Sequence, residues 1–367
     1  MTLADRYHCG PHGSHSQGWL FCLFALVIMS GAIGGCAEGP AVLQLQGGTM
    51  GTTWHVTVVD APADITSAEL QQGIEVQLEA VNRSMSTYLA ESEISRFNAL
   101  GIASWFDTSP DFFRVLTTAL DVGRKSDGAY DITVGPLIAL WGFGPSGDIE
   151  VLPEEDAITA ALARVGQTRL ELDQSKRSVM KQVDLSMDFS SLAKGYAVDK
   201  VAQWLADNQV NRFLVEVGGE MRMSGMSARE DLWRIAIEQP DSSTRSMAVA
   251  LRLTDVAVAT SGDYRNYFEL DGQRFSHSID SRTGYPVTHD LVSVTVVHAH
   301  AMLADAWATA LIILGTERAM AVAEAQRLAV YFIHRTEEGY SHSHSSSFSA
   351  YLEQADLESD HSAGNET

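Results

Sequence analysis

At residues 301–315 the chain reads AMLADAWATALIILG. Apolar side chains occupy nearly every side of the helix that this segment predicts, so we expect the helix to be buried all round, with Gly315 as its end. Asp305 and Thr309 lie four residues apart inside it and therefore share one face. A buried carboxylate without a partner is costly, so something positive should face Asp305.

Three kinds of partner fit Asp305. Mg²⁺ prefers carboxylate, hydroxyl and carbonyl oxygens and keeps waters and phosphates as its other ligands. Alternatively, Asp305 caps a helix that starts one turn later, or it pairs with an arginine such as Arg282. Because caps and ion pairs are commoner than metal sites, this segment alone favours the last two alternatives.

Residues 188–199 read DFSSLAKGYAVD and predict a strand, a turn rich in small and hydroxyl residues, and the start of a helix. Free N–H groups and the positive end of such a helix form an anion site, to which Lys194 would add a point charge for phosphate. An ordinary serine-capped helix with an exposed lysine explains the segment equally well. The spacing of a P-loop is absent.

A third group of polar residues lies in the segments ATSGDYRNY, residues 259–267, and FSHSIDSRTGYP, residues 275–286. His277 titrates near neutrality and could remove a proton from an attacking hydroxyl. The alternative is that residues 280–284 form only a tight turn with an internal ion pair, and that His277 is a hydrogen-bonded core residue. Taken alone, the polarity of a loop favours this alternative.

Helix-like and strand-like segments alternate along the rest of the chain and predict a mixed α/β (α+β) fold in one catalytic domain, residues 47–352. Gly47 and Gly48 are expected to end the first strand, and the acidic tail 353–367 to be disordered. The predicted helices are 68–85, 112–126 and 195–207; the predicted strands are 42–46, 54–59, 184–188, 213–217, 233–238, 248–253, 257–260 and 291–297; a hairpin, 267–278, turns at Asp271-Gly272.

The N-terminal region has the pattern of an export signal. Residues 19–33 are apolar but short for a membrane span, and Ile33-Gly34-Gly35-Cys36 resembles the bacterial lipobox. We therefore expect a lipoprotein signal peptide at 1–35, lipidation of Cys36, a linker at 36–46, and a body anchored to the bacterial cell envelope and facing the periplasm. The residue after Cys36 is not aspartate, and by the bacterial sorting rule this favours anchoring in the outer membrane. An uncleaved anchor is the alternative.

The composition limits the possible partners. The formal net charge is −22, with 45% apolar and 20% charged residues, which is typical of a globular protein but repels phosphate backbones. Nucleic acid is therefore an unfavourable partner. An anionic dinucleotide could bind only where backbone N–H groups, a helix N-terminus or a cation supply local positive potential.

Taken together, the motifs resemble the ApbE family, the FAD:protein FMN transferases, in order over residues 48–352. So many motifs in one order are far more specific than any single one. The matching segments are TMGT at 49–52, MSTY at 85–88, SRFN at 95–98, GAYDITVGPL at 128–137, LWGFG at 140–144, AKGYAVD at 193–199, residues 259–267 and ADA at 304–306.

The resemblance implies a single catalytic domain of the T-fold-like ApbE type that binds FAD as substrate and Mg²⁺ as cofactor. The metal would be held by the Asp305 carboxylate, the Thr309 hydroxyl and the backbone carbonyl of Ser191. His277 matches the position suspected of activating the acceptor hydroxyl, which makes it a catalytic candidate together with Asp305. The implied FAD contacts are Met50, Tyr88, Ala129, Tyr130, Asp131, Lys194 and Ile279.

The chain departs from the family pattern at Ser281, where most members have proline, and we expect a slightly looser turn there. The implied reaction transfers FMN from FAD to a Ser or Thr hydroxyl of an acceptor flavoprotein, expected to belong to a membrane respiratory complex, and releases AMP. Two alternatives stay open at this point: an FAD pyrophosphatase that gives FMN and AMP, and a non-catalytic FAD-binding lipoprotein.

Overall fold

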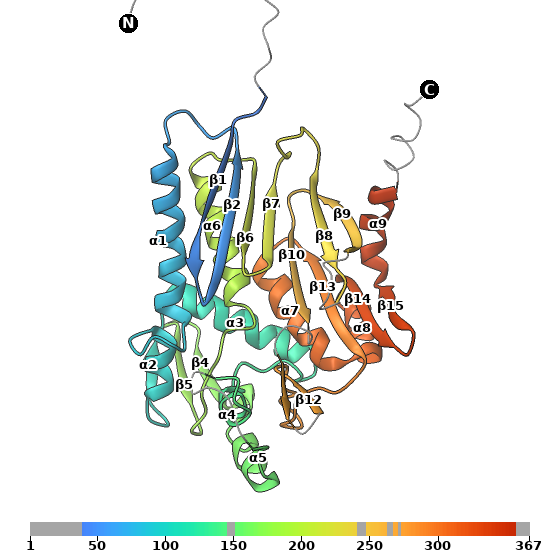
Figure 1. Ribbon diagram of the computed structural model, residues 1–367. Coiled ribbons are helices and arrows are strands. Elements are labelled where there is room, and N and C mark those ends of the chain that lie inside the picture. Colours follow the sequence, from blue (N-terminus) through green and yellow to red (C-terminus); the bar gives the residue numbers. More distant parts are fainter. Residues whose placement is uncertain (1–38, 145–150, 241–246, 263–266, 271–272, 357–367) are drawn as a thin grey trace, which may run out of the picture. The chain divides into compact units, whose positions relative to one another are not determined.

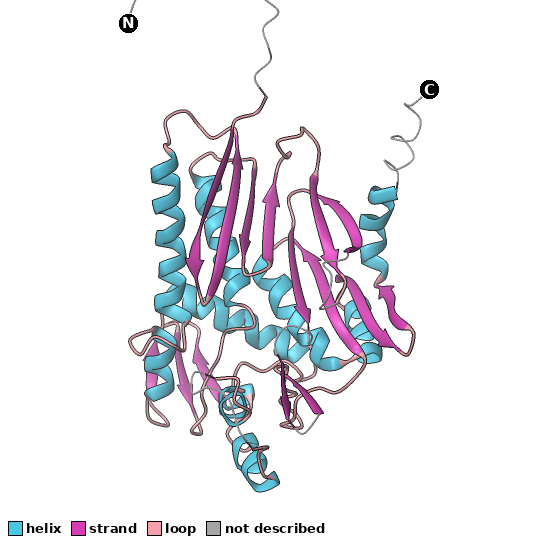
Figure 2. Cartoon of the chain, in the orientation of Figure 1, coloured by secondary structure: helices cyan, strands magenta, loops and turns pink. Residues whose placement is uncertain are grey.

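An eight-stranded antiparallel sheet is the centre of the computed structural model (Figures 1 and 2). The structure describes residues 39–144, 151–240, 247–262, 267–270 and 273–356, and the folded unit starts at Pro40. In order across the sheet, the strands are β1 (Val42–Thr49), β2 (Thr52–Val59), β6 (Phe213–Val217), β7 (Glu220–Ser224), β10 (Ala257–Gly262), β13 (Leu291–His298), β14 (Ala329–Thr336) and β15 (Gly339–His344).

Helices cover one face of this sheet (Figure 1). Helix α7 (Ala301–Leu314) contacts β10 and β13, α6 (Ala193–Asp207) contacts β6 and β7, and α1 (Ser67–Met85) contacts β1. The largest hydrophobic core lies between these helices and the sheet. Two further helices pack against α7: α3 (Pro110–Lys125) and α8 (Thr316–Ala325).

A second, smaller core lies on the other face of the sheet. The hairpin β8 (Trp233–Glu238) and β9 (Met247–Leu253) meets alternate side chains of β10, β13 and β14 there, and α9 (Ser349–Asp356) contacts β9. Strand β13 is therefore buried on both faces, and five of its eight residues are apolar.

Shorter elements lie at one end of the folded unit, below the main sheet in the view of Figure 1. They include the three-stranded sheet β3 (Trp105–Asp107), β5 (Ser178–Lys181) and β4 (Leu170–Asp173), and the pair β11 (Tyr267–Leu270) and β12 (Gln273–Ser276). The remaining helices are α2 (Glu93–Ala99), α4 (Gly135–Leu140) and α5 (Glu155–Leu162), with 3₁₀ turns η1 (Gln167–Arg169) and η2 (Ser346–Phe348).

The prediction for residues 301–315 is confirmed. Helix α7 runs from Ala301 to Leu314, and every residue in it is buried except Leu303 and Thr309, which are half-buried. Gly315 ends the helix with a φ of 73°, a left-handed conformation that glycine adopts without strain. The mixed fold class is confirmed as well, with a sheet that is antiparallel throughout.

The prediction that Gly47 and Gly48 end the first strand is wrong. Strand β1 continues through both to Thr49, so the domain begins before residue 47. The chain reverses instead at Met50-Gly51, whose φ angles of 50° and 70° suit a two-residue hairpin loop. Gly47 has a packing role, because a Cβ there would lie 2.7 Å from Nε1 of Trp54.

The strand expected at 184–188 does not form. That segment makes one isolated bridge, between Ser186 and Val134, because the side chain of Asn98 occupies the backbone N–H and C=O of Met187. At the C-terminus, α9 extends over the first four residues of the predicted tail. Several predictions concern residues that lie outside the described ones: the signal peptide expected at 1–35, Cys36, the turn expected at 271–272, residues 263–266 and the part of the tail at 357–367.

Within the part of the chain that the structure describes, no helix combines the length and the apolar character that crossing a bilayer requires.

The contact between α1 and α6 depends on Gly73, since a Cβ there would lie 2.0 Å from a ring carbon of Trp204. Alanine normally strengthens a helix by about 1 kcal/mol relative to glycine. We expect Gly73→Ala instead to lower the free energy of unfolding by about 1–3 kcal/mol, the usual cost of overpacking. Urea unfolding measures this effect, with Gly101→Ala, whose Cβ meets no atom within 4 Å, as the control. Equal stability of Gly73→Ala and the parent chain would contradict the packing.

Candidate active site

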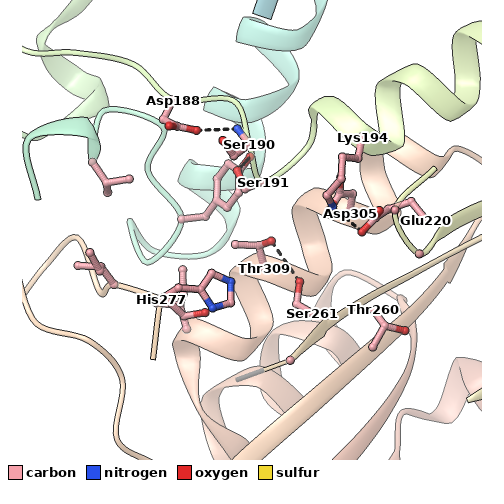
Figure 3. A pocket seen from close by; sticks show the side chains of 18 of the residues that line it. Asp188, Ser190, Ser191, Lys194, Glu220, Thr260, Ser261, His277, Asp305 and Thr309 are labelled. Atoms are coloured by element: carbon pink, nitrogen blue, oxygen red, sulfur yellow. Dashed lines mark hydrogen bonds and ion pairs between the residues drawn. The ribbon is translucent and has the colours of Figure 1, made fainter. Parts of the chain in front are cut away.

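One cavity of about 490 Å³ opens where the start of α6 and one face of α7 meet the start of β7 and the end of β10 (Figure 3). Lys194, Asp305 and Glu220 cluster together, and Thr309 and His277 face the same space. The structure thus brings together most of the residues that the sequence singled out. Those that line the cavity are Ala129, Tyr130, Asp131, Ser191, Lys194, His277, Ile279, Asp305 and Thr309.

Met50 and Tyr88 do not line this cavity. Met50 lies in the hairpin loop between β1 and β2, where it packs against the main core. Tyr88 lies in the loop after α1 and is 71% exposed.

Asp305 is a buried carboxylate held between a helix start and a lysine. It is 3% exposed, its Oδ2 accepts a hydrogen bond of 2.9 Å from the backbone N–H of Gly195, and its Oδ1 lies 3.9 Å from Nζ of Lys194. Burial raises the pKa of Asp305, against the opposing effects of Lys194 and the Gly195 N–H. The carboxylate therefore retains capacity for a further cation.

Neither alternative for Asp305 is found as expected, although Asp305 does cap a helix start and does lie 3.9 Å from the ammonium of Lys194. Helix α7 starts four residues before it, so Asp305 caps the start of a different helix, α6, through Gly195. Arg282 binds Asp280 through two hydrogen bonds, of 2.8 and 2.6 Å. Residues 280–284 do form the expected tight turn with an internal ion pair.

Glu220 is a second buried carboxylate, and sequence analysis missed it. Its Oε1 lies 2.7 Å from Nζ of Lys194, and its Oε2 has no hydrogen-bond partner among the described residues. Burial raises the pKa of Glu220. Burial lowers the pKa of Lys194, but the neighbouring Asp305 and Glu220 raise it by more, so the pKa of Lys194 lies above its ordinary value. The only sequence signal was a glutamate directly after Gly218-Gly219, which by itself indicates a turn.

This cluster places one ammonium beside two carboxyl groups whose pKa values burial raises, so a bound cation would favour their ionised form. Thr309 lies one turn from Asp305, and its hydroxyl is 3.2 Å from Oγ of Ser261. Among the described residues there is no group of three or more His, Cys, Asp or Glu that could hold a metal. The oxygen donors present suit Mg²⁺, which takes few carboxylates and completes its shell with water and phosphate oxygens.

The loop at 129–133 forms another wall of the cavity. The buried hydroxyl of Tyr130 accepts a hydrogen bond of 2.8 Å from Oγ of Ser191, and burial raises the pKa of Tyr130. Both oxygens of Asp131 accept hydrogen bonds, from Thr133 and from the backbone N–H of Gln167. Burial raises the pKa of Asp131 above its ordinary value. The carboxylate of Asp131 thus fixes the shape of this wall.

The segment 277–284 is fastened to that same wall. His277 is half-buried in the cavity and lies edge-on to Phe143, with 6.4 Å between ring centroids. Ser281, expected to loosen the turn, donates a hydrogen bond of 2.7 Å to the carbonyl of Gly128. Nε1 of Trp141 donates another, of 2.8 Å, to the carbonyl of Gly284. The turn is therefore tied at both ends.

Comparison with known proteins agrees with this geometry. A model of the ApbE family matches residues 50–332. The chain belongs to the ApbE family. The cavity therefore lies in an ApbE domain, the family that the motifs resemble.

Relatives cover nearly the whole domain. The chain is 41% identical over 337 residues to the FAD:protein FMN transferase of Vibrio cholerae, spanning 92% of this chain and 99% of that protein. It is 41% identical over 301 residues to the FAD:protein FMN transferase of Escherichia coli K12, spanning 81% of this chain and 85% of that protein.

Solved structures show the same ApbE fold. The flavin transferase ApbE from Vibrio cholerae superposes with a TM-score of 0.80 at 40% identity, covering 85% of this chain and all of that one. The apo form of the Pseudomonas stutzeri flavinyl transferase ApbE gives a TM-score of 0.79 at 37% identity, covering 86% and 98%.

The ion pair between Lys194 and Glu220 allows a test of the charge balance in this ApbE site. Lys194→Met leaves two buried carboxylates without an ammonium, and we expect the free energy of unfolding to fall by about 3 kcal/mol. Adding Glu220→Gln should recover much of that loss, because it removes one of the unpaired charges. Denaturant unfolding in EDTA measures both, and a double variant no more stable than Lys194→Met would contradict the assigned pair.

Proposed function

We propose that this chain is an FAD:protein FMN transferase, which moves FMN from FAD to a Ser or Thr hydroxyl of an acceptor protein and releases AMP. The observation that carries the proposal is the cavity itself, in which a helix start with a lysine, a buried acidic pair and a histidine converge. The ApbE relatives that bear this name match almost the full length of the domain.

The start of α6 supplies the attraction for the diphosphate of FAD. Free N–H groups and the positive end of a helix favour anions, and Lys194 adds a full charge beside them. The side chain of Lys194 is 30% exposed and lines the cavity, with its ammonium paired to Glu220. The residues that line the remaining walls, among them Tyr130, Asp131 and Ile279, are the proposed contacts for the flavin half.

The proposed metal site consists of Asp305, Thr309 and the backbone carbonyl of Ser191, and its support is that all three residues line the one cavity. When bound there, Mg²⁺ would neutralise negative charge on the diphosphate. Glu220 keeps Lys194 charged and oriented at the mouth of the cavity.

In the reaction, the acceptor hydroxyl oxygen forms a bond to the FMN-side phosphorus. The bond from that phosphorus to the bridging oxygen breaks, and AMP leaves with the electron pair. A ring nitrogen of His277 accepts the hydroxyl proton. Because phosphoryl transfer depends mainly on positioning and electrostatics, the protein needs no nucleophile of its own.

Asp305→Asn tests the proposal most directly. The purified chain is incubated with FAD, Mg²⁺ and solubilised membrane proteins from a bacterium that lacks its own flavin transferase. We expect AMP release together with a protein that gains FMN, both lost in Asp305→Asn because the amide carries no charge for the cation. Asp111→Asn, on α3, is the control, since Asp111 does not line the cavity.

The two alternative functions give other results in that assay. AMP released equally with and without acceptor proteins would indicate a pyrophosphatase, and intact FAD after long incubation would indicate a carrier. Labelling by Asp305→Asn at the rate of the parent chain would exclude the metal assignment.

His277→Asn separates chemistry from binding. We expect the transfer rate to fall by about 10²–10⁴-fold, the usual contribution of a general base, while the affinity for FAD stays nearly unchanged. Stopped assays of FMN transfer and quenching of flavin fluorescence measure the two effects. A matching loss of FAD affinity would assign His277 to binding instead.

We also propose that the chain is a lipoprotein anchored through Cys36 and facing the periplasm, where its acceptor is a flavoprotein of a membrane respiratory complex. The support is the apolar segment 19–33 followed by small residues and a cysteine. Cys36→Ala should move the full chain from the membrane to the soluble fraction of expressing cells, because it removes the site of acylation. Unchanged membrane binding would instead favour an uncleaved anchor.

A further inference from the structure

The two helices that form the site both begin without a cap of their own. Leu192 precedes α6 and His300 precedes α7, and neither side chain bonds to the start of its helix. The first N–H groups of a helix have no partner within it, and inside a protein they need acceptors from elsewhere.

Each helix supplies the missing acceptor for the other. Asp305 of α7 accepts from the N–H of Gly195 at 2.9 Å. In return, Asp199 of α6 accepts from the N–H groups of Ala301 and Met302, at 3.0 Å each. Gly195 and Asp199 are one helical turn apart, as are Ala301 and Asp305, so two matching contacts join the helices.

The backbones touch between these contacts. A Cβ on Gly195 would lie 2.3 Å from the carbonyl oxygen of Ala301 and 2.8 Å from Cβ of Asp305. Two positive helix ends therefore lie side by side, and the carboxylates of Asp199 and Asp305 offset their repulsion.

Strand β7 holds the same arrangement to the sheet. Nη1 of Arg222 lies 2.6 Å from Oδ1 of Asp199, and Glu220, two residues earlier on the strand, binds Lys194. Asp199 does not line the cavity and is 13% exposed. Any effect of Asp199 on the site is therefore indirect, and its contacts with the site's helices include the first turn of α7, which it holds.

We propose that Asp199 is a positioning residue: by capping α7 from α6, it sets the place of Asp305 relative to Gly195 and Lys194, and thereby the affinity of the site for Mg²⁺ and the FAD diphosphate. This inference rests on the proposed function for the identity of the ligands. It assigns Asp199 no contact with either of them.

Asp199→Asn is the first test. The amide oxygen can still accept one N–H, but the NH₂ group cannot accept the second, and the ion pair with Arg222 is lost. We expect the Mg²⁺ concentration for half-maximal FMN transfer to rise about tenfold, as for other residues that orient a metal ligand, with kcat at saturating Mg²⁺ changed much less. Calorimetric titration of FAD at fixed Mg²⁺ measures binding in the absence of an acceptor protein, and it should show a similar loss of affinity for FAD.

Asp111→Asn is the matched control. Asp111 of α3 forms an ion pair with Lys200 of α6, with 3.0 Å between Oδ2 of Asp111 and Nζ of Lys200. Loss of this ion pair should lower the thermal midpoint without changing the Mg²⁺ requirement. If Asp199→Asn does not fold, Arg222→Gln replaces it, because it keeps both caps and removes only the anchor on β7. A smaller shift in the same direction is then expected.

An unchanged Mg²⁺ requirement and unchanged FAD affinity in Asp199→Asn, or in Arg222→Gln if that variant must be used, would overturn the inference. Failure of the parent chain to transfer FMN would defeat the proposed function alone, since FAD titration would still report on the role of Asp199.

Discussion

The contact between the starts of α6 and α7 is the constraint on which the site depends. A buried carboxylate in an apolar helix is unfavourable unless donors meet it, and the N–H of Gly195 and the ammonium of Lys194 do so. That contact requires a glycine, because any side chain at 195 would push the helices apart. The sheet that both helices cover, and the two ion pairs from β7, keep them together.

The same contact explains how a chain with a net charge of −22 can hold an anionic ligand. Positive potential is created locally, by two helix ends and one lysine, and is limited by two buried carboxylates in the same cluster. In the proposed function, this mixture of positive and negative groups would accommodate a cation and a diphosphate together.

Local patterns determined a good deal of the fold. The apolar run 301–314, the amphipathic segment 67–85 and the strands near 213–217 and 291–297 each carry a strong periodic signal, and all of them form. Predictions from weaker patterns were wrong where a side chain distant in the sequence determined the local backbone structure. The side chain of Asn98 bonds to the backbone N–H and C=O of Met187, and no strand forms at 184–188. Gly47, which was predicted to end a strand, instead leaves space for the ring of Trp54.

By itself, the sequence determined the buried helix with Asp305, the lysine-bearing helix start and the order of motifs, since each is a property of neighbouring residues. Only the tertiary structure decided which donor meets Asp305, that Glu220 joins it, and that Asp199 caps a helix about a hundred residues away. Those pairings depend on how two helices and a strand pack. Packing over such separations leaves no mark on the local pattern of residues.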